Sequence, residues 1–176
     1  EFNNFIAYAN CPLSGYFDKW VAVHLRELIE RCRPDGFWID GDWAGPCYCP
    51  RCEARYRKET GLTGPMPEYN LATPEGRAWS RVWAGIMHEW RVKFNRFIKE
   101  LKPDCLYSAG NVSPRREFLA PFDWRSGDFF SPGHFEMHDV ARMMRWYDTL
   151  GVPYDAYVCD TSFTHVRKQV RSRTKT

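Results

Sequence analysis

The sequence has no long apolar run, no strong excess of charge of one sign, and no leader pattern. None of its segments approaches the roughly 20 apolar residues of a membrane span, and no basic-then-apolar stretch opens the chain. Its 25 Lys and Arg residues against 22 Asp and Glu residues leave a formal charge of +3, which is too small and too dispersed to indicate nucleic acid. We therefore expect a cytoplasmic bacterial protein that binds neither membranes nor nucleic acid.

Three common catalytic motifs are also absent: a Gly-rich phosphate loop, a G-x-S-x-G elbow and an H-E-x-x-H pair. Seven cysteines are an odd number, which does not suit a small secreted disulfide scaffold. Aromatic residues, by contrast, make up 16% of the chain, and only 27% of the residues are charged. This composition is typical of a folded domain, and we expect a single one over residues 1–176.

Hydrophobic periodicity predicts that helices and strands alternate along the chain. The two long helices are expected over residues 15–33 and 79–101. The first should bury a stripe of residues spaced by three and four: Phe17, Val21, His24, Leu25, Leu28, Ile29 and Cys32. Shorter helices are expected within 48–60 and over 140–150, and strands at 5–8, 36–39, 105–109, 128–130 and 154–159. The apolar run at 36–39 suits a strand buried on both faces, and the Gly and Pro residues of 61–76 indicate a loop. Each long helix leads into its strand through a similar turn, Arg33-Pro34-Asp35 or Lys102-Pro103-Asp104. Two helix–turn–strand units of one design indicate an α/β architecture with parallel strands.

Polar residues follow the predicted strands at Asp40, Asn111, Glu136 and Asp160. Polar groups at the carboxyl ends of parallel strands are typical of the catalytic face of a (β/α)8 TIM barrel, which needs about 250 residues when complete. The expectation is therefore a partial barrel, about strands 3–7, with a zinc-binding loop at 47–52. A second copy of the chain could complete the barrel. An open doubly wound sheet is the alternative.

The most specific local pattern is Cys47-Tyr48-Cys49-Pro50-Arg51-Cys52. Its C-x-C-x-x-C spacing brings three thiolates close enough to share one tetrahedral ion, and a closed structural zinc site takes four ligands. Cys11, in a loop that opens a helix, is the best fourth ligand, whereas Cys32, Cys105 and Cys159 are expected in the core. A disulfide or free thiols within 47–52 are the alternatives. Zinc held by four thiolates would be structural, with no catalytic cofactor implied.

Carboxylates after the predicted strands form the second pattern. Asp40 directly follows an aromatic strand, where a carboxylate is costly unless it is paired or functional. A retaining glycosidase needs one carboxylate as nucleophile and a second as acid/base about 5 Å away. Asp40 suits the first role and Glu136 is expected in the second, with Asp160 and Glu117 as alternatives. Solvated surface positions are the competing interpretation for each of them.

Several nearby side chains suit a sugar. Trp38 and Trp43 offer flat apolar faces that could stack on the C–H side of a sugar ring. His134 lies in a loop beyond a predicted strand, where ring hydroxyls could be hydrogen-bonded, and Asp42 and Asp160 are expected to bind substrate too. The alternative for Asp42 is turn hydrogen bonding.

Residues 25–43 resemble the α-L-fucosidase family, in which a helix ending in Leu-Arg-Glu-Leu leads through Pro-Asp into an aromatic strand capped by Trp-x-Asp-Gly. The resemblance implies a (β/α)8 barrel that acts on glycosides, and it places the family's nucleophile on Asp40. Residues 127–132 resemble a later segment of that family, of the type Gly-Asp-Phe-x-Thr-Pro-Glu. Gly133 stands where the family has its glutamate, so no acid/base carries over, and Glu136 is taken in its place.

The cysteine pattern points to a second resemblance. Asn10-Cys11-Pro12-Leu13-Ser14, a helix, and then the C-x-C-P-x-C segment are similar to the zinc cluster of thermophilic-type β-galactosidases. The resemblance implies a structural zinc ion on Cys11, Cys47, Cys49 and Cys52.

Together these patterns predict a retaining, α-L-fucosidase-like glycoside hydrolase that acts on a carbohydrate substrate. A β-galactosidase-like enzyme is one alternative. Another is a non-catalytic, zinc-stabilised module that binds carbohydrate through Trp38, Trp43 and Trp124. A third treats the cysteines of 47–52 as a redox or metal-transfer site.

Overall fold

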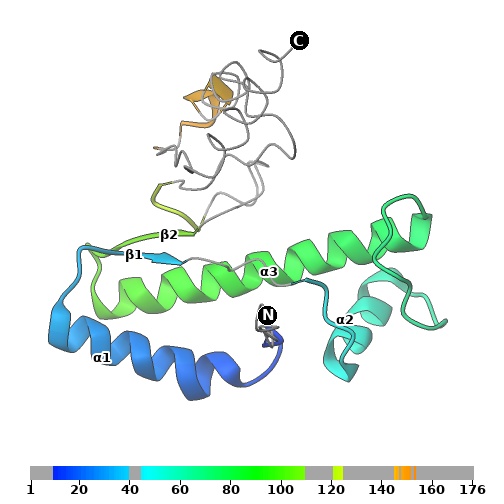
Figure 1. The fold of residues 1–176 in the computed structure, drawn as a ribbon, viewed down its shortest axis with the longest axis horizontal. Helices are drawn as coiled ribbons and strands as arrows, with labels where there is room; N and C mark the ends of the chain where they lie inside the picture. The colour runs from blue at the N-terminus through cyan, green and yellow to red at the C-terminus, as the bar shows by residue number, and fades with distance from the viewer. Residues whose placement is uncertain are drawn as a thin grey trace, which may run out of the picture. The chain divides into compact units, whose positions relative to one another are not determined.

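The computed structural model describes residues 10–39, 45–109, 121–124, 145–146, 148–151 and 153. Its elements, in chain order, are η1 (Phe17–Val21), α1 (Ala22–Cys32), β1 (Gly36–Ile39), α2 (Pro50–Thr60), α3 (Pro74–Leu101) and β2 (Leu106–Ala109) (Figure 1). The chain divides into two compact units, of which one contains these helices and the other contains the two strands. Whether residues 1–176 behave as a single domain stays a prediction.

The expectation of a (β/α)8 barrel, or of a slice comprising about strands 3–7, is wrong for the part of the chain that the structure describes. That part is mostly helical, with a single sheet of two parallel strands. A barrel repeats one helix after each strand. Here two helices, α2 and α3, follow one another between β1 and β2 without a strand between them. The long helix α3 packs against α1 and α2, so that helix–helix packing builds the core of this unit.

The parallel pairing expected from the repeated turn sequence is confirmed. β1 and β2 pair in register from Gly36 opposite Leu106 to Ile39 opposite Ala109. Beyond β2, the backbone N–H of Tyr107 donates to the Asp123 carboxylate at 2.8 Å, and the Asp123 N–H donates to the Tyr107 carbonyl at 2.9 Å. The strands predicted at 5–8, 128–130 and 154–159 lie outside the described residues.

The first helical segment is held to α3 by the buried ring of Phe17. This ring meets Trp90, Phe94 and Phe97 edge-on, with centroids 5.3, 5.6 and 5.7 Å away. Lys93 Nζ lies 4.4 Å from the Phe17 ring centroid and bonds both Asp18 oxygens, at 2.8 and 3.0 Å. Aromatic edge contacts and a cation over a ring each add to the area buried, so Phe17 anchors η1 and α1 to α3.

The stripe predicted for the first helix is only partly buried. Phe17, Leu25 and Ile29 lie in the core, whereas Leu28 and Cys32 are exposed. The helix ends as expected before Pro34, with Arg33 in the left-handed conformation at φ 47° as its C-cap. The periodicity therefore identifies the helix correctly but overestimates how much of its surface is covered.

α3 begins at Pro74, five residues before the predicted start at residue 79. Thr73 is its N-cap: the Thr73 hydroxyl accepts a bond from the Gly76 N–H at 3.1 Å, and Pro74 fills the first helical position. The Thr73 hydroxyl also donates to the Asn70 carbonyl at 3.1 Å. The loop and the first turn of α3 thus form one hydrogen-bonded unit.

Two glycines of α3 provide a matched test of this start. A Cβ on Gly76 would lie 2.0 Å from the Asn70 carbonyl oxygen, whereas a Cβ on Gly85 would meet nothing within 4 Å. We expect Gly76→Ala to lower the free energy of unfolding by about 1–3 kcal/mol, because backbone must move. Gly85→Ala should raise it by about 0.5–1 kcal/mol, since only the helix-propensity gain acts there. Urea unfolding followed by circular dichroism measures both; shifts in the same direction would contradict the described start.

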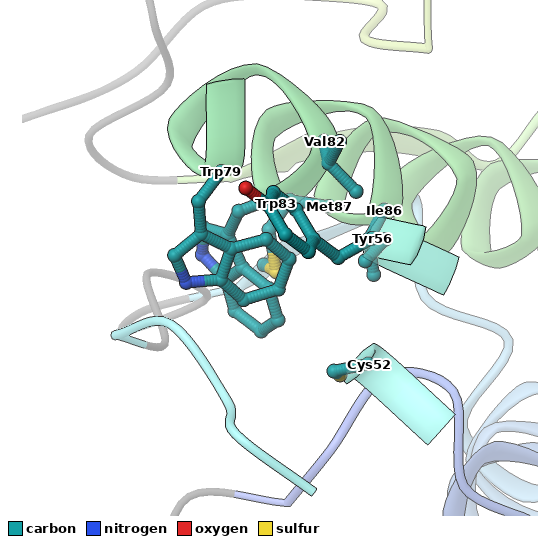
Figure 2. Packing of buried hydrophobic residues seen from close by; sticks show 7 residues of the cluster. All are labelled: Cys52, Tyr56, Trp79, Val82, Trp83, Ile86 and Met87. Carbon is teal, nitrogen blue, oxygen red and sulfur yellow. The ribbon is translucent and has the colours of Figure 1, made fainter. Parts of the chain in front are cut away.

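α2 and α3 enclose a hydrophobic core between them. Figure 2 shows Tyr56 and Cys52 on α2 with Trp79, Trp83 and other apolar side chains of α3. Trp79, Tyr56 and Cys52 are each at most 1% exposed. The Tyr56 ring meets the Trp79 ring edge-on at 5.7 Å, and the Trp83 ring lies 5.8 Å from that of Trp79. This core packs directly against the remaining cysteines of the predicted metal site.

An ion pair adds a second link between α2 and α3. The Arg55 guanidinium donates from Nη1 to Glu89 Oε2 at 3.1 Å and from Nη2 to the other oxygen of Glu89, and its Nε donates to Glu59. Both carboxylates raise the pKa of Arg55.

Among the described residues, no helix combines the length and the apolar character needed to cross a membrane.

Candidate metal centre

The four cysteines predicted as metal ligands come together in the structure. The sulfur atoms of Cys11, Cys47, Cys49 and Cys52 all lie within 4.8 Å of one another. Cys11 Sγ is 3.5 Å from both Cys52 Sγ and Cys49 Sγ. None of the four is in a disulfide, so the alternative of a disulfide within 47–52 does not describe this state. Four close cysteines can hold a metal ion.

Local structure explains how three of these cysteines reach one point. Cys49 is the N-cap of α2, Pro50 occupies the first helical position, and Cys52 lies in the first turn. Cys47 and Tyr48 precede the helix outside any helix or strand, and Cys49 is extended, at φ −71° and ψ 161°. The fixed φ of Pro50 and the helical turn that follows therefore direct the C-P-x-C sulfurs to the same side.

Cys11 reaches the same point from a segment that is remote in sequence. It stands 38 residues before Cys49 and 41 before Cys52. A turn follows it directly, in which the Ser14 N–H donates to the Cys11 carbonyl at 2.9 Å. Leu13, like Cys11, packs against the core between α2 and α3. The apolar contact of Leu13 thus helps to bring the Cys11 thiol to the other three.

The spacing of the sulfurs suits tetrahedral coordination. Sulfur ligands at about 2.3 Å from a tetrahedral zinc ion are about 3.8 Å from one another. The separations of 3.5 Å from Cys11, and the limit of 4.8 Å for the whole set, lie around that value. Four thiolates leave no open position for a substrate or water, so an ion bound here would be structural. No metal is identified by this geometry, but soft thiolates favour zinc over hard cations such as magnesium.

The thiols differ in acidity because their surroundings differ. Burial raises the pKa of Cys11 to about 11 and also raises the pKa of Cys52, which its neighbours Cys11 and Cys49 raise further. Burial acts in the same direction on Cys49, but the backbone N–H of Cys52 and the neighbouring thiols outweigh it and lower its pKa to about 7. Four thiolates repel one another at this spacing, and a divalent cation would remove that cost.

Aromatic residues around the cluster are the part of the site that sequence analysis missed. Tyr56 stands four residues after Cys52 on α2 and is 1% exposed. The Tyr48 ring, between two of the cysteines, is half exposed and lies 6.1 Å from the buried Trp79 ring. The i, i+4 spacing of Cys52 and Tyr56 is a signal that could have identified Tyr56, whereas Trp79 is a long-range neighbour with no local signal.

The predicted sugar-binding and catalytic residues are mostly outside the described part of the chain. This holds for both proposed catalytic carboxylates and for the other polar and aromatic candidates: Asp40, Asp42, Trp43, Glu117, His134, Glu136 and Asp160. Trp38 is described: it lies on β1 opposite Ser108 and is 45% exposed. The expectation that the strand is buried on both faces is therefore wrong at Trp38. The roles of all these residues stay predictions.

The three cysteines expected in the core have different outcomes. Cys105 is fully buried, as predicted. Cys32 is exposed on α1, and the prediction that it lies in the core is wrong, because no described element covers that side of the helix. Cys159 lies outside the described residues.

Part of the chain is similar to two curated β-galactosidases. β-Galactosidase LacA of Lactobacillus acidophilus is 25% identical over 85 residues, which cover 46% of this chain and 12% of that protein. β-Galactosidase LacZ of Lactobacillus acidophilus strain NCFM is similar to the same extent. No protein-family model matches the chain, and no solved structure matches it. This partial likeness links the chain to glycoside hydrolases and gives no support to the α-L-fucosidase resemblance.

Proposed function

We propose that this chain is part of a glycoside hydrolase that acts on β-galactosides and that its four cysteines hold a structural zinc ion. The 85-residue likeness to two β-galactosidases carries the proposal. The convergence of four thiols within 4.8 Å supports the zinc. Because the chain spans 12% of the length of each of these relatives, the activity belongs to the whole protein.

In this proposal the reaction proceeds with retention. Asp40 is the nucleophile that attacks the anomeric carbon, and Glu136 is the acid/base that first protonates the leaving oxygen and then activates water. Trp38, whose ring is 45% exposed on β1, stacks on the sugar two residues before Asp40. Asp42, Trp43, His134 and Asp160 complete the sugar contacts.

The zinc ion, when bound, supplies rigidity rather than chemistry. Cys47 and Cys49 hold the start of α2, and Cys11 ties that start to the segment before η1. Residues 40–46 run from the end of β1 to Cys47, so the metal would fix one end of the stretch that carries Asp40. A nucleophile must be held to a fraction of an ångström, which a fixed loop end favours.

This function can be tested by measuring the turnover of a panel of aryl glycosides by the intact gene product. We expect turnover of an aryl β-D-galactoside to exceed that of an aryl α-L-fucoside by about tenfold or more in kcat/KM, which is a difference of about 1.4 kcal/mol in transition-state stabilisation. Faster turnover of the α-L-fucoside would contradict the proposed preference for β-galactosides. Absence of turnover across the panel would contradict the proposed glycosidase activity.

A second function is favoured by the exposure of Trp38. An aromatic ring that is 45% exposed on a strand also suits a module that binds sugar without cleaving it. Galactose binding that is lost in Trp38→Ala, in a protein that turns over none of the aryl glycosides, would favour this module over the hydrolase.

A further inference from the structure

We infer that Cys49 is an oxidative modification site: a peroxide oxidises its thiolate, Cys11 displaces the oxidised oxygen, and a Cys11–Cys49 disulfide replaces the metal. This inference rests on one part of the proposed function, the zinc ion bound by the four cysteines. The disulfide is expected whether or not the protein hydrolyses glycosides. The same four cysteines would therefore hold a metal ion under reducing conditions and a disulfide under oxidising ones.

The placement of the sulfurs makes Cys11 one member of the pair, with Cys49 as a neighbour at contact distance. Cys11 Sγ lies 3.5 Å from Cys49 Sγ, whereas a disulfide bond is about 2.05 Å long, so a small movement of two side chains brings them to bonding distance. Cys11 directly precedes a hydrogen-bonded turn and belongs to no helix, so its side chain can move without disturbing α2.

Access to solvent excludes Cys52 as the sulfur that is oxidised first. Cys52 is also 3.5 Å from Cys11, but it is fully buried, so a peroxide has no direct path to it. Cys11, Cys47 and Cys49 are partly exposed, and the sulfurs of Cys11 and Cys49 are in contact at 3.5 Å. A partly exposed thiolate with a second thiol at contact distance is the arrangement that redox-sensitive cysteines share.

The chemistry balances with a peroxide as the oxidant. The Cys49 thiolate attacks the peroxide, an S–O bond forms, the O–O bond breaks, and the leaving oxygen departs with a proton as water or an alcohol. The Cys11 thiolate then attacks the Cys49 sulfur, an S–S bond forms, the S–O bond breaks, and hydroxide leaves and is protonated by solvent. Two electrons pass from the two sulfurs to the peroxide. A zinc ion held by the four thiolates would thereby lose two of its four ligands, and its release is expected.

The disulfide would preserve the link that the metal makes. It joins the segment before η1 to the start of α2 across the same 38 residues that the metal spans. Either cross-link restricts the unfolded chain. The oxidised, zinc-free protein is therefore expected to keep a higher melting temperature than the reduced, zinc-free protein.

The experiment treats the zinc-loaded intact gene product with hydrogen peroxide and follows zinc with a colorimetric chelator. We expect about one zinc ion to be released per disulfide formed, and peptide mapping without reduction to show Cys11 joined to Cys49. Reductant plus zinc should reverse both changes. A main disulfide between any other pair, or sulfinic acid without a disulfide, would overturn the inference.

Two variants sharpen the test. Cys32→Ser removes an exposed cysteine outside the cluster and should change neither zinc release nor the disulfide map. Cys11→His keeps a zinc ligand but removes the thiol at contact distance, so dimedone should trap more sulfenic acid on Cys49 than it does in the wild type. Should Cys11→His fail to fold, or should the wild type prove free of zinc, the disulfide map of the wild type still decides the outcome.

Discussion

Replacing Cys11 by serine is expected to remove the bound zinc and to lower the free energy of unfolding by about 4 kcal/mol or more. A serine hydroxyl is a poor zinc ligand, and three thiolates in a site built for four leave an incomplete coordination shell. Cys11 is also the one ligand outside 47–52, so its loss releases the segment before η1 from α2. The fall in stability corresponds to a melting temperature lower by about 8–16 °C.

Zinc content by elemental analysis and thermal unfolding followed by circular dichroism measure the two effects. Cys32→Ser is the matched control: the Cys32 side chain is exposed on α1, and its replacement should stay within about 0.5 kcal/mol of the wild type. An unchanged zinc content in Cys11→Ser would show that Cys11 is not a ligand. A loss of zinc without a loss of stability would mean that the ion is not structural.

Asp40→Asn is expected to lower kcat for the aryl β-galactoside by about 1,000-fold or more in the intact gene product. The amide has nearly the shape of the carboxylate but cannot form the glycosyl ester, so binding should change much less than turnover. A companion variant, Asp40→Gly, leaves room for azide, which should attack the sugar from the vacated side and yield a glycosyl azide of inverted configuration.

Asp35→Asn is the control for Asp40→Asn. Asp35 is an exposed carboxylate five residues earlier, in the turn before β1, and its replacement should leave kcat unchanged. Equal activity of Asp40→Asn and the wild type would remove Asp40 from the mechanism. Loss of activity in Asp40→Gly without rescue by azide would assign Asp40 a structural role instead.

The metal centre was predictable because most of it is local. The C-x-C-x-x-C spacing places three thiols at the start of α2 and just before it. A closed zinc site takes a fourth ligand, and the position of Cys11 in a loop that opens a helix made it the best candidate. The contacts that support the site were not predictable in the same way. Trp79 stands 27 residues beyond Cys52, and only the packing of α3 against α2 brings it there.

The parallel pairing of β1 and β2 was predictable from two matching turns. The barrel that we inferred from this pairing is wrong for the described residues. Periodicity shows that a helix has an apolar stripe, but it does not show which element covers that stripe. α1 illustrates the limit, because Leu28 falls on the predicted buried stripe and is 45% exposed. The start of α3 was predicted too late for a similar reason. Thr73 and Pro74 form a typical helix start, but the Gly and Pro residues around them indicated a loop through residue 76.

The distance of Cys11 from the other three ligands has a consequence for biosynthesis. Ribosomes deliver Cys11 first, and the coordination shell can close only after Cys52 has left the exit tunnel. The aromatic contacts of Phe17 form later still, because Trp90, Phe94 and Phe97 lie further along the chain than Cys52. Until then η1 and α1 lack these aromatic contacts, so a metal ion could bind the four thiols before α3 docks against them.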